Sequence, residues 1–251
     1  MQAEPLLSTS QLVKRFGGLV ATDNVSIDVR DQEIHALIGP NGAGKTTLLG
    51  QLTGNLAPDS GTICLAGRDV TRLAAYARVR LGLARSFQIT SVLREFTALD
   101  NVALAVQAHD GHSFRFLADA RNERRLREPA RALLDAVGLG ECALSPASAL
   151  SHGEQRQLEI AMALAGNPRL LLLDEPMAGM GMEESQRMVG LLRGVRGRCA
   201  MLLIEHDMDA VFALADRITV LVYGRIIASG TPREIRAHPE VRQAYLGEEV
   251  A

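Results

Sequence analysis

The sequence is poor in the features that mark disulfide-rich, zinc-binding and membrane-spanning proteins. Its three cysteines, Cys64, Cys142 and Cys199, lie far apart and without C-x-x-C spacing. They therefore indicate neither a disulfide framework nor a zinc site, and they fit a reducing, cytosolic compartment. No apolar run approaches the roughly 20 residues that a helix needs to span a bilayer. Residues 1–5 lack the basic and apolar regions of a signal peptide, so we expect any role at a membrane to depend on partner proteins.

A surplus of positive charge is also missing. The 27 Lys and Arg residues are balanced by 29 Asp and Glu residues, for a net charge of -2, so no global field attracts nucleic acid or anionic lipid. The composition, with 47% hydrophobic residues, is ordinary for a globular protein. A chain of 251 residues can bury the core of one large domain, whereas two full domains would be cramped.

The clearest positive signal is a glycine-rich stretch between a predicted strand, 34–38, and a predicted helix that opens near residue 44. It fits the phosphate-loop pattern G-x-x-x-x-G-K-[ST] in full, through Gly39, Pro40, Asn41, Gly42, Ala43, Gly44, Lys45, Thr46 and Thr47. Glycines let consecutive backbone N–H groups turn inward around phosphates, and the helix adds its positive N-terminal end. We predict that Lys45 reaches the β and γ phosphates and that Thr46 offers its hydroxyl to Mg²⁺. A plain glycine turn is the weaker alternative.

Two further apolar runs end in charged residues. Residues 170–173 are all leucine and are bounded by prolines, which is typical of a buried parallel strand, and Asp174 and Glu175 follow at its end. Two carboxylates there are costly unless they meet a cation or a hydrogen-bond partner. We assign Asp174 to Mg²⁺ and its waters, and Glu175 to the water that attacks the γ phosphate. A second run, 201–204, leads to His206, which could reach the same phosphate.

Three other features are weaker when each is taken alone. Phe16 lies beside a glycine pair and could stack on adenine, although a packed aromatic beside a turn is an equal alternative. Residues 151–155 lead into a helix that is predicted from about 155 to 165, and they form either an anion site or a simple cap. Helical apolar spacing from 97 to about 137 predicts a helical lobe, whose arginines are best explained by a solvated face.

In this order the motifs resemble the nucleotide-binding subunits of ATP-binding-cassette (ABC) transporters over nearly the whole chain. The resemblance implies an α/β fold, with a P-loop NTPase core, an antiparallel β layer and an α-helical subdomain. We expect a single ABC ATPase domain over 1–251. Residues 1–87 and 168–251 would form the RecA-like core with the antiparallel layer, and 88–167 the helical subdomain.

The resemblance also implies roles for single residues. Phe16 would stack on adenine, and Gln88 would be the Q-loop glutamine that senses Mg²⁺ and the γ phosphate. Glu175 would be the catalytic base and His206 the switch histidine. The phosphate loop corresponds to the Walker A motif, and 170–174 to the Walker B strand. The family's Ser-Gly-Gly-Gln signature corresponds to Ser151, His152, Gly153 and Glu154.

Partners follow from the same resemblance. Two cassettes would pack head to tail, so that the signature of one acts on the ATP held by the Walker A loop of the other. The dimer would energise two transmembrane permease subunits, contacted near 88–101, and would serve a periplasmic solute-binding protein indirectly. The implied place is the cytoplasmic face of a bacterial inner membrane, with ATP and Mg²⁺ as ligands and no nucleic acid.

Several positions depart from the family pattern. His152 and Glu154 replace a glycine and a glutamine of the signature, and Gly181 stands where the D-loop commonly has Asp or Asn. Gln32 occupies a turn position that is commonly glycine. A carboxylate near a triphosphate is electrostatically awkward, so Glu154 is expected to bond the backbone instead of phosphate.

The phosphate loop, the signature variant and the closing residues 244–248 resemble the branched-chain amino-acid importer cassettes of the LivG type. Cassettes of urea, short-amide and aromatic-acid importers are close alternatives for the transported solute. A soluble ABC ATPase acting on ribosomes or DNA is less favoured, because the chain has one cassette, no heptad run and no net positive charge. A small-molecule kinase built on the same loop is disfavoured by the signature stretch, Glu175 and His206.

Overall fold

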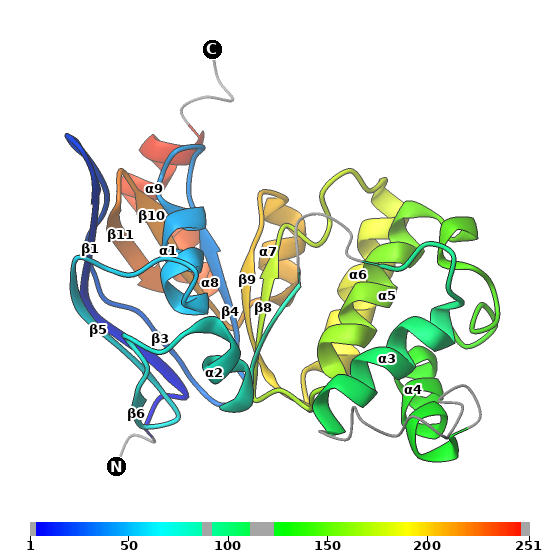
Figure 1. Cartoon of the computed structure of the whole chain (residues 1–251). Coiled ribbons are helices and arrows are strands. Elements are labelled where there is room, and N and C mark those ends of the chain that lie inside the picture. Colours follow the sequence, from blue (N-terminus) through cyan, green and yellow to red (C-terminus); the bar gives the residue numbers. More distant parts are fainter. Residues whose placement is uncertain (1–3, 87–91, 111–122, 247–251) are drawn as a thin grey trace.

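The computed structural model describes residues 4–86, 92–110 and 123–246. It contains an antiparallel sheet, a mostly parallel sheet and a group of helices, which lie from left to right in Figure 1. This combination matches the predicted α/β class. Within the described ranges no helix is long and apolar enough to cross a bilayer.

The antiparallel sheet is built on one long strand at the start of the chain. This strand, β1 (Leu7–Phe16), pairs with β2 (Leu19–Val25), β3 (Asp28–Val29) and β5 (Ser60–Leu65), and β6 (Arg68–Asp69) pairs with β5. The pairing of Phe16 with Leu19 leaves a two-residue glycine turn at the tip of the β1–β2 hairpin. Phe16 therefore lies at the tip of this hairpin, where its side chain is half exposed.

The second sheet positions the candidate site. Its order is β11-β10-β4-β9-β8-β7, and only β11 runs antiparallel to its neighbour. Its strands are β4 (Ile34–Ile38), β7 (Leu83–Arg85), β8 (Leu170–Asp174), β9 (Ala200–Ile204), β10 (Arg217–Val222) and β11 (Arg225–Gly230). Because the carboxyl ends of parallel strands share an edge, β4, β8 and β9 deliver the phosphate loop, Asp174 with Glu175, and His206 to one side of the sheet.

Strand β8 is apolar without interruption because both of its faces are covered. Leu171 and Leu173 join a core cluster with the helices on one side. Leu170 and Leu172 join a second cluster with α1 and the antiparallel sheet on the other. All five residues of the strand are buried, as the leucine run predicts.

The helices cover the six-stranded sheet and form the group at the right of Figure 1, where α3 to α6 lie together. They are α1 (Lys45–Thr53), α2 (Ala75–Arg80), α3 (Ala98–Asp110), α4 (Arg124–Ala136), α5 (His152–Leu164), α6 (Met182–Val195), α7 (Met208–Leu214), α8 (Pro232–Ala237) and α9 (Pro239–Val241). A 3₁₀ turn spans Ala147–Ala149, and a π-helical turn, Arg242–Leu246, closes the described chain. Helix α5 begins three residues earlier than the predicted start near residue 155, because Ser151 is its N-cap.

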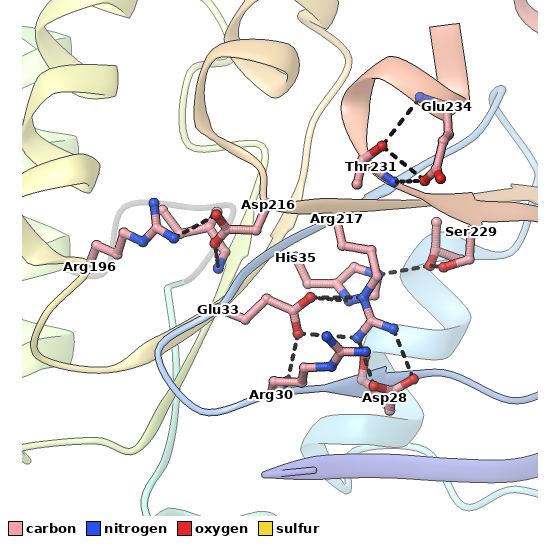
Figure 2. A network of polar contacts seen from close by, with 12 residues as sticks. Asp28, Arg30, Glu33, His35, Arg196, Asp216, Arg217, Ser229, Thr231 and Glu234 are labelled. Carbon is pink, nitrogen blue, oxygen red and sulfur yellow. Dashed lines mark hydrogen bonds and ion pairs between the residues drawn. The ribbon is translucent and has the colours of Figure 1, made fainter. Parts of the chain in front are cut away.

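A polar network locks the edge of the sheet opposite the phosphate loop (Figure 2). Arg217, the first residue of β10, donates to both carboxylate oxygens of Asp28 on β3, at 2.7 and 3.1 Å, and to those of Glu33 before β4, at 2.8 and 3.2 Å. Its hydrogen bonds hold the pKa of Asp28 below its usual range. Asp216 accepts from the backbone of Ile34 at 3.0 Å and from Arg196 at 2.6 Å. The network therefore joins the antiparallel layer to the start of the strand that carries the phosphate loop.

His35 lies inside this network, on β4. Its side chain is 1% exposed, its Nε2 lies 2.8 Å from Thr219 Oγ1, and Thr219 in turn bonds Ser229 at 2.8 Å. Burial lowers the pKa of His35 to about 4, against the neighbouring carboxylate of Glu33. The imidazole is therefore neutral in the folded protein at neutral pH.

Candidate nucleotide-binding site

A cleft of about 460 Å³ opens at the carboxyl edge of the parallel strands. It is lined by Phe16, Leu19, Val20, Ala21, Asn41, Gly42, Ala43, Gly44, Lys45, Thr46, Thr47, Glu175, His206 and Tyr223. The fold thus brings together the predicted stacking aromatic, seven residues of the phosphate loop, the predicted base and the predicted switch histidine. Phe16 is 50% exposed beside its glycine turn, and its stacking on adenine stays a prediction.

Neighbouring strands hold the phosphate loop in its curved shape. Gly42 and Gly44 have φ of 78° and 105°, conformations that favour glycine. A Cβ on Gly44 would clash with the carbonyl oxygen of Ala21, on β2. On the far side the backbone N–H of Gly224, in the β10–β11 turn, donates to the carbonyl of Ala43 at 2.8 Å. Contacts with β2 and with the β10–β11 turn therefore fix the path of the loop backbone.

Lys45 begins α1 and points back into its own loop. Its Nζ donates to the carbonyl oxygens of Gly39 at 2.5 Å and Pro40 at 3.1 Å, and the residue is 7% exposed. Burial lowers the pKa of Lys45, while the negative charges of Glu175 and Asp174 act in the opposite direction. Gly39 and Pro40 thus support the lysine and do not line the cleft themselves.

Glu175 and His206 form a pair across the ends of β8 and β9. The Nε2 atom of His206 lies 2.7 Å from Oε1 of Glu175. The side chains are 42% and 26% exposed, respectively. Glu175 adopts a left-handed φ of 49°, a costly conformation that is over-represented at functional sites. The pair can therefore meet a solvent molecule in the cleft.

Glu205 supports this pair from beneath and was missed by the sequence analysis. Its carboxylate is buried and accepts from the backbone N–H of Met177 at 2.7 Å and from that of His206 at 3.0 Å. Burial raises its pKa. The available signal was an acid at the end of a buried strand, directly before the candidate histidine.

Asp174 makes an ion pair that the sequence analysis also missed. Its Oδ2 accepts from the guanidinium of Arg85 at 3.0 Å, and its side chain is 5% exposed. Arg85 ends β7, which pairs in parallel with β8. Gln88, the third residue after Arg85 and a predicted Mg²⁺ and γ-phosphate sensor, lies outside the described residues.

The donor set fits Mg²⁺ held together with a nucleotide. Thr46 offers a hydroxyl from the first turn of α1 and Asp174 a carboxylate, which are the hard oxygen ligands that Mg²⁺ prefers. In the described part of the chain, no group of three or more His, Cys, Asp or Glu side chains could hold a metal without help. The site therefore suits a cation that takes few protein ligands and completes its shell with phosphate and water.

The predicted signature residues lie elsewhere. Ser151, Gly153 and Glu154 line a separate cavity of about 240 Å³, which shares no lining residue with the cleft. Glu154 Oε2 accepts from the backbone N–H of Ser151 at 2.8 Å, and Glu154 N–H donates to Ser151 Oγ at 3.3 Å. The expectation that Glu154 bonds the backbone is therefore met. His152 is exposed, close to Gly179.

The other departures also have structural counterparts. Gln32 has a positive φ of 58°, which explains why a glycine would suit this turn. Gly181 is the N-cap of α6, where its N–H donates to Glu184 at 3.4 Å.

Fold and cleft together define a P-loop nucleotide-binding protein of the α/β class, and the comparisons with known proteins narrow this class. The pattern of the ABC transporter family matches residues 22–178. The pattern of the branched-chain amino acid ATP-binding cassette transporters matches residues 225–251. The chain belongs to the ABC transporter family and is one of its ATP-binding cassettes, as its motifs predicted.

Relatives cover almost the full length of the chain. The high-affinity branched-chain amino acid transport ATP-binding protein LivG of Salmonella typhimurium is 42% identical, over 98% of this chain and 99% of LivG. The corresponding protein BraF of Pseudomonas aeruginosa is 40% identical over the same shares. A crystal structure of an ATP-binding cassette of an ABC transporter in its ADP conformation is 30% identical, with a TM-score of 0.87 over 98% of this chain and 100% of that one.

Proposed function

We propose that this chain is the ATP-hydrolysing subunit of a bacterial importer for branched-chain or other hydrophobic amino acids. The observation that carries the enzymatic part is the Glu175–His206 pair at the phosphate-loop cleft. The loop amides, Lys45 and the start of α1 bind the triphosphate, and Phe16 stacks on adenine. Glu175 orients or deprotonates the attacking water, and His206 holds the carboxylate and contacts the γ phosphate.

Mg²⁺ fits the same assignment and would neutralise charge on the phosphates. Thr46 and Asp174 would hold it, with Gln88 as the predicted third contact. Lys45 would exchange its loop carbonyls for phosphate oxygens, which offer stronger, charge-assisted hydrogen bonds.

A second cassette, identical or homologous, completes the working unit. The separate position of the Ser151–Glu154 stretch supports this, because these residues line no part of the cleft in their own chain. They would face the nucleotide of the partner cassette, which becomes part of the dimer interface. Hydrolysis would then reopen the dimer by removing the γ phosphate.

Contact with two permease subunits is assigned to the surface near 88–101. Exposed Leu93 and Phe96 support this assignment. A cavity of about 250 Å³ between α2, β7 and the ends of α3 and α5 adds apolar lining, including Val79 and Met162. We assign the chain to the cytoplasmic face of the inner membrane, with residues 88–167 acting as a helical subdomain between core and permease. A periplasmic solute-binding protein would be served indirectly.

A cassette does not contact the transported molecule, so its own residues do not identify the solute. The proposed solute depends on the match of residues 225–251 and on the names of the relatives. Uptake of labelled leucine by cells that lack this chain and its close homologues tests the assignment. The wild-type chain should restore uptake and Glu175→Gln should not. Restored uptake of urea, an amide or an aromatic acid in place of leucine would move the chain to the alternative importers. Recovery of only soluble partners from native membranes would favour the non-transport alternative.

A further inference from the structure

We propose that Tyr223 is a nucleotide-binding residue whose ring packs against the base and ribose of the bound nucleotide. The proposal rests on the function proposed above, because it takes the phosphate-loop cleft as the nucleotide site. It adds a second aromatic contact, from the β10–β11 turn, to the contact already assigned to Phe16 on the β1–β2 hairpin.

The turn that carries Tyr223 is fixed beside the phosphate loop. Tyr223 and Gly224 connect β10 to β11. The N–H of Gly224 donates to the carbonyl of Ala43 at 2.8 Å, and the carbonyl of Gly224 accepts from the N–H of Asp23, on β2, at 2.8 Å. The guanidinium of Arg225 lies 2.6 Å from the Asp23 carboxylate. These contacts hold the backbone of Tyr223 between β2 and the loop.

Tyrosine is a poorly suited residue for this turn. Tyr223 and Gly224 have φ of 46° and 77°, and a two-residue hairpin turn with two positive φ values favours the sequence Asn-Gly. A bulky side chain at positive φ is a steric outlier. Packing against the protein offsets little of this cost, because Tyr223 is 86% exposed. Costly conformations of this kind cluster at ligand sites, so the exposed ring indicates contact with a ligand.

The chemistry of the cleft indicates which part of the ligand the ring meets. The loop amides and Lys45 supply N–H donors, which suit phosphate. Phe16, Leu19 and Tyr223 line the same cleft and are 50%, 67% and 86% exposed. Large apolar side chains exposed together in a concave site mark a ligand surface. The base and ribose are the part of a nucleotide that suits an aromatic ring, so we assign Tyr223 to them.

The first experiment compares a whole nucleotide with its phosphates alone. ADP and inorganic pyrophosphate, each with Mg²⁺, are titrated into the full chain and followed by calorimetry. Tyr223→Asn should weaken ADP binding about fivefold, because an aromatic contact is lost, and should leave pyrophosphate binding unchanged. Tyr223→Phe keeps the ring and should bind both ligands as wild type does.

Asparagine is chosen so that the test does not depend on a loss of folding. It suits the positive φ of this turn, so Tyr223→Asn should unfold at the same urea concentration as wild type or at a higher one. Tyr76→Asn is the matched control, because Tyr76 is a 69% exposed tyrosine on α2 that does not line the cleft; it should change neither affinity.

Three results of this titration would overturn the proposal. Unchanged ADP binding by Tyr223→Asn would mean that the ring does not contact the nucleotide. An equal loss of ADP and pyrophosphate binding would mean that the residue acts on the phosphate loop through the turn. Weaker pyrophosphate binding by Tyr223→Phe would mean that the hydroxyl contacts phosphate.

The second experiment observes the ring itself. The chain has three tyrosines and no tryptophan, so tyrosine emission can be measured directly, and a base packed against a phenol ring quenches that emission. ADP should quench wild type and Tyr76→Phe, whereas pyrophosphate should quench neither. In Tyr223→Phe the quench should be largely lost although ADP still binds. A quench that persists in Tyr223→Phe contradicts the contact.

The outcomes separate this inference from the proposed function. If wild type binds ADP and hydrolyses ATP but Tyr223→Asn binds ADP as wild type does, only the role of Tyr223 fails. If wild type binds neither ADP nor pyrophosphate, the proposed nucleotide site fails and the role of Tyr223 fails with it.

Discussion

His206 Nε2 lies 2.7 Å from Glu175 Oε1, and this contact joins the ends of two neighbouring parallel strands. The backbone N–H of Glu175 also donates to the carbonyl of Ile204 at 2.8 Å, which holds its left-handed φ. The Glu205 carboxylate accepts from the backbone N–H groups of Met177 and His206, and so fixes the chain beside both members of the pair. The position of the Glu175 carboxylate is thus determined by tertiary contacts from β9, and the predictions below begin from this geometry.

Glu175→Gln should abolish most ATP hydrolysis while leaving nucleotide binding intact. A glutamine keeps the shape of the side chain but cannot accept the proton of the attacking water, and loss of a general base costs about 10²–10⁴-fold in rate. Phosphate release and the affinity for a fluorescent ATP analogue report the two steps. Glu183→Gln, at an exposed position in the first turn of α6, is the control and should hydrolyse ATP normally. Full turnover by Glu175→Gln would refute the assignment of the base.

Two replacements of His206 should show whether its role is to hold the Glu175 carboxylate or to contact the γ phosphate. His206→Ala removes the 2.7 Å contact with Glu175 and should slow hydrolysis at least tenfold, with a small effect on ATP affinity. His206→Gln can still donate a hydrogen bond to the carboxylate and should recover part of the rate. Equal rates for the two variants, measured at saturating ATP, would show that the histidine does not act by holding Glu175.

Two glycines of the phosphate loop should differ sharply when changed to alanine. At Gly44 the new Cβ meets the carbonyl of Ala21 at a φ of 105°, so Gly44→Ala should lower the free energy of unfolding by about 3 kcal/mol. At Gly42 the φ is also positive, 78°, but no atom lies within 4 Å of the added Cβ, so the cost should be about 1 kcal/mol. Urea unfolding of the two variants compares them directly. A similar loss in both would mean that backbone strain, and not the clash with β2, limits the loop.

Local patterns predicted the phosphate loop, the leucine strand and the two charged strand ends, because each is encoded within about ten consecutive residues. The partners that complete these motifs could not be predicted in the same way. Arg85 bonds an aspartate 89 residues away, and Arg217 bonds one 189 residues away. Such pairs arise from the order of strands in the sheet, which periodicity does not specify. The start of α5 was placed three residues too late, although a cap was considered for residues 151–155, because the sequence does not show which residue of the stretch is the N-cap.

His35 should make stability depend on pH between about 6.5 and 4. Burial lowers its pKa in the folded protein to about 4, whereas the unfolded chain takes up the proton near 6.5. The unfolded state therefore binds more protons in this window, and stability falls as the pH falls, by about 3 kcal/mol in total. His35→Gln should lose this component. The difference between the two proteins isolates His35, because Glu205, whose pKa burial raises, titrates in both. If wild type and His35→Gln lost the same free energy of unfolding between pH 7 and pH 5, the assignment would be contradicted.

Glu154→Gln should strengthen the ATP-dependent dimer that the proposed function requires. In the structure Glu154 caps its own helix, accepting from Ser151 N–H at 2.8 Å, and a glutamine oxygen can keep this bond. The substitution therefore removes a negative charge from the start of α5, where the partner's triphosphate is proposed to bind, without removing the cap. In the Glu175→Gln background, which prevents hydrolysis, the ATP concentration that gives half-maximal dimer by size-exclusion chromatography should fall severalfold. Gln157→Glu adds a charge one turn further along α5 and should act in the opposite direction. If neither substitution changed the ATP concentration for half-maximal dimer, the start of α5 would not face a phosphate in the closed dimer.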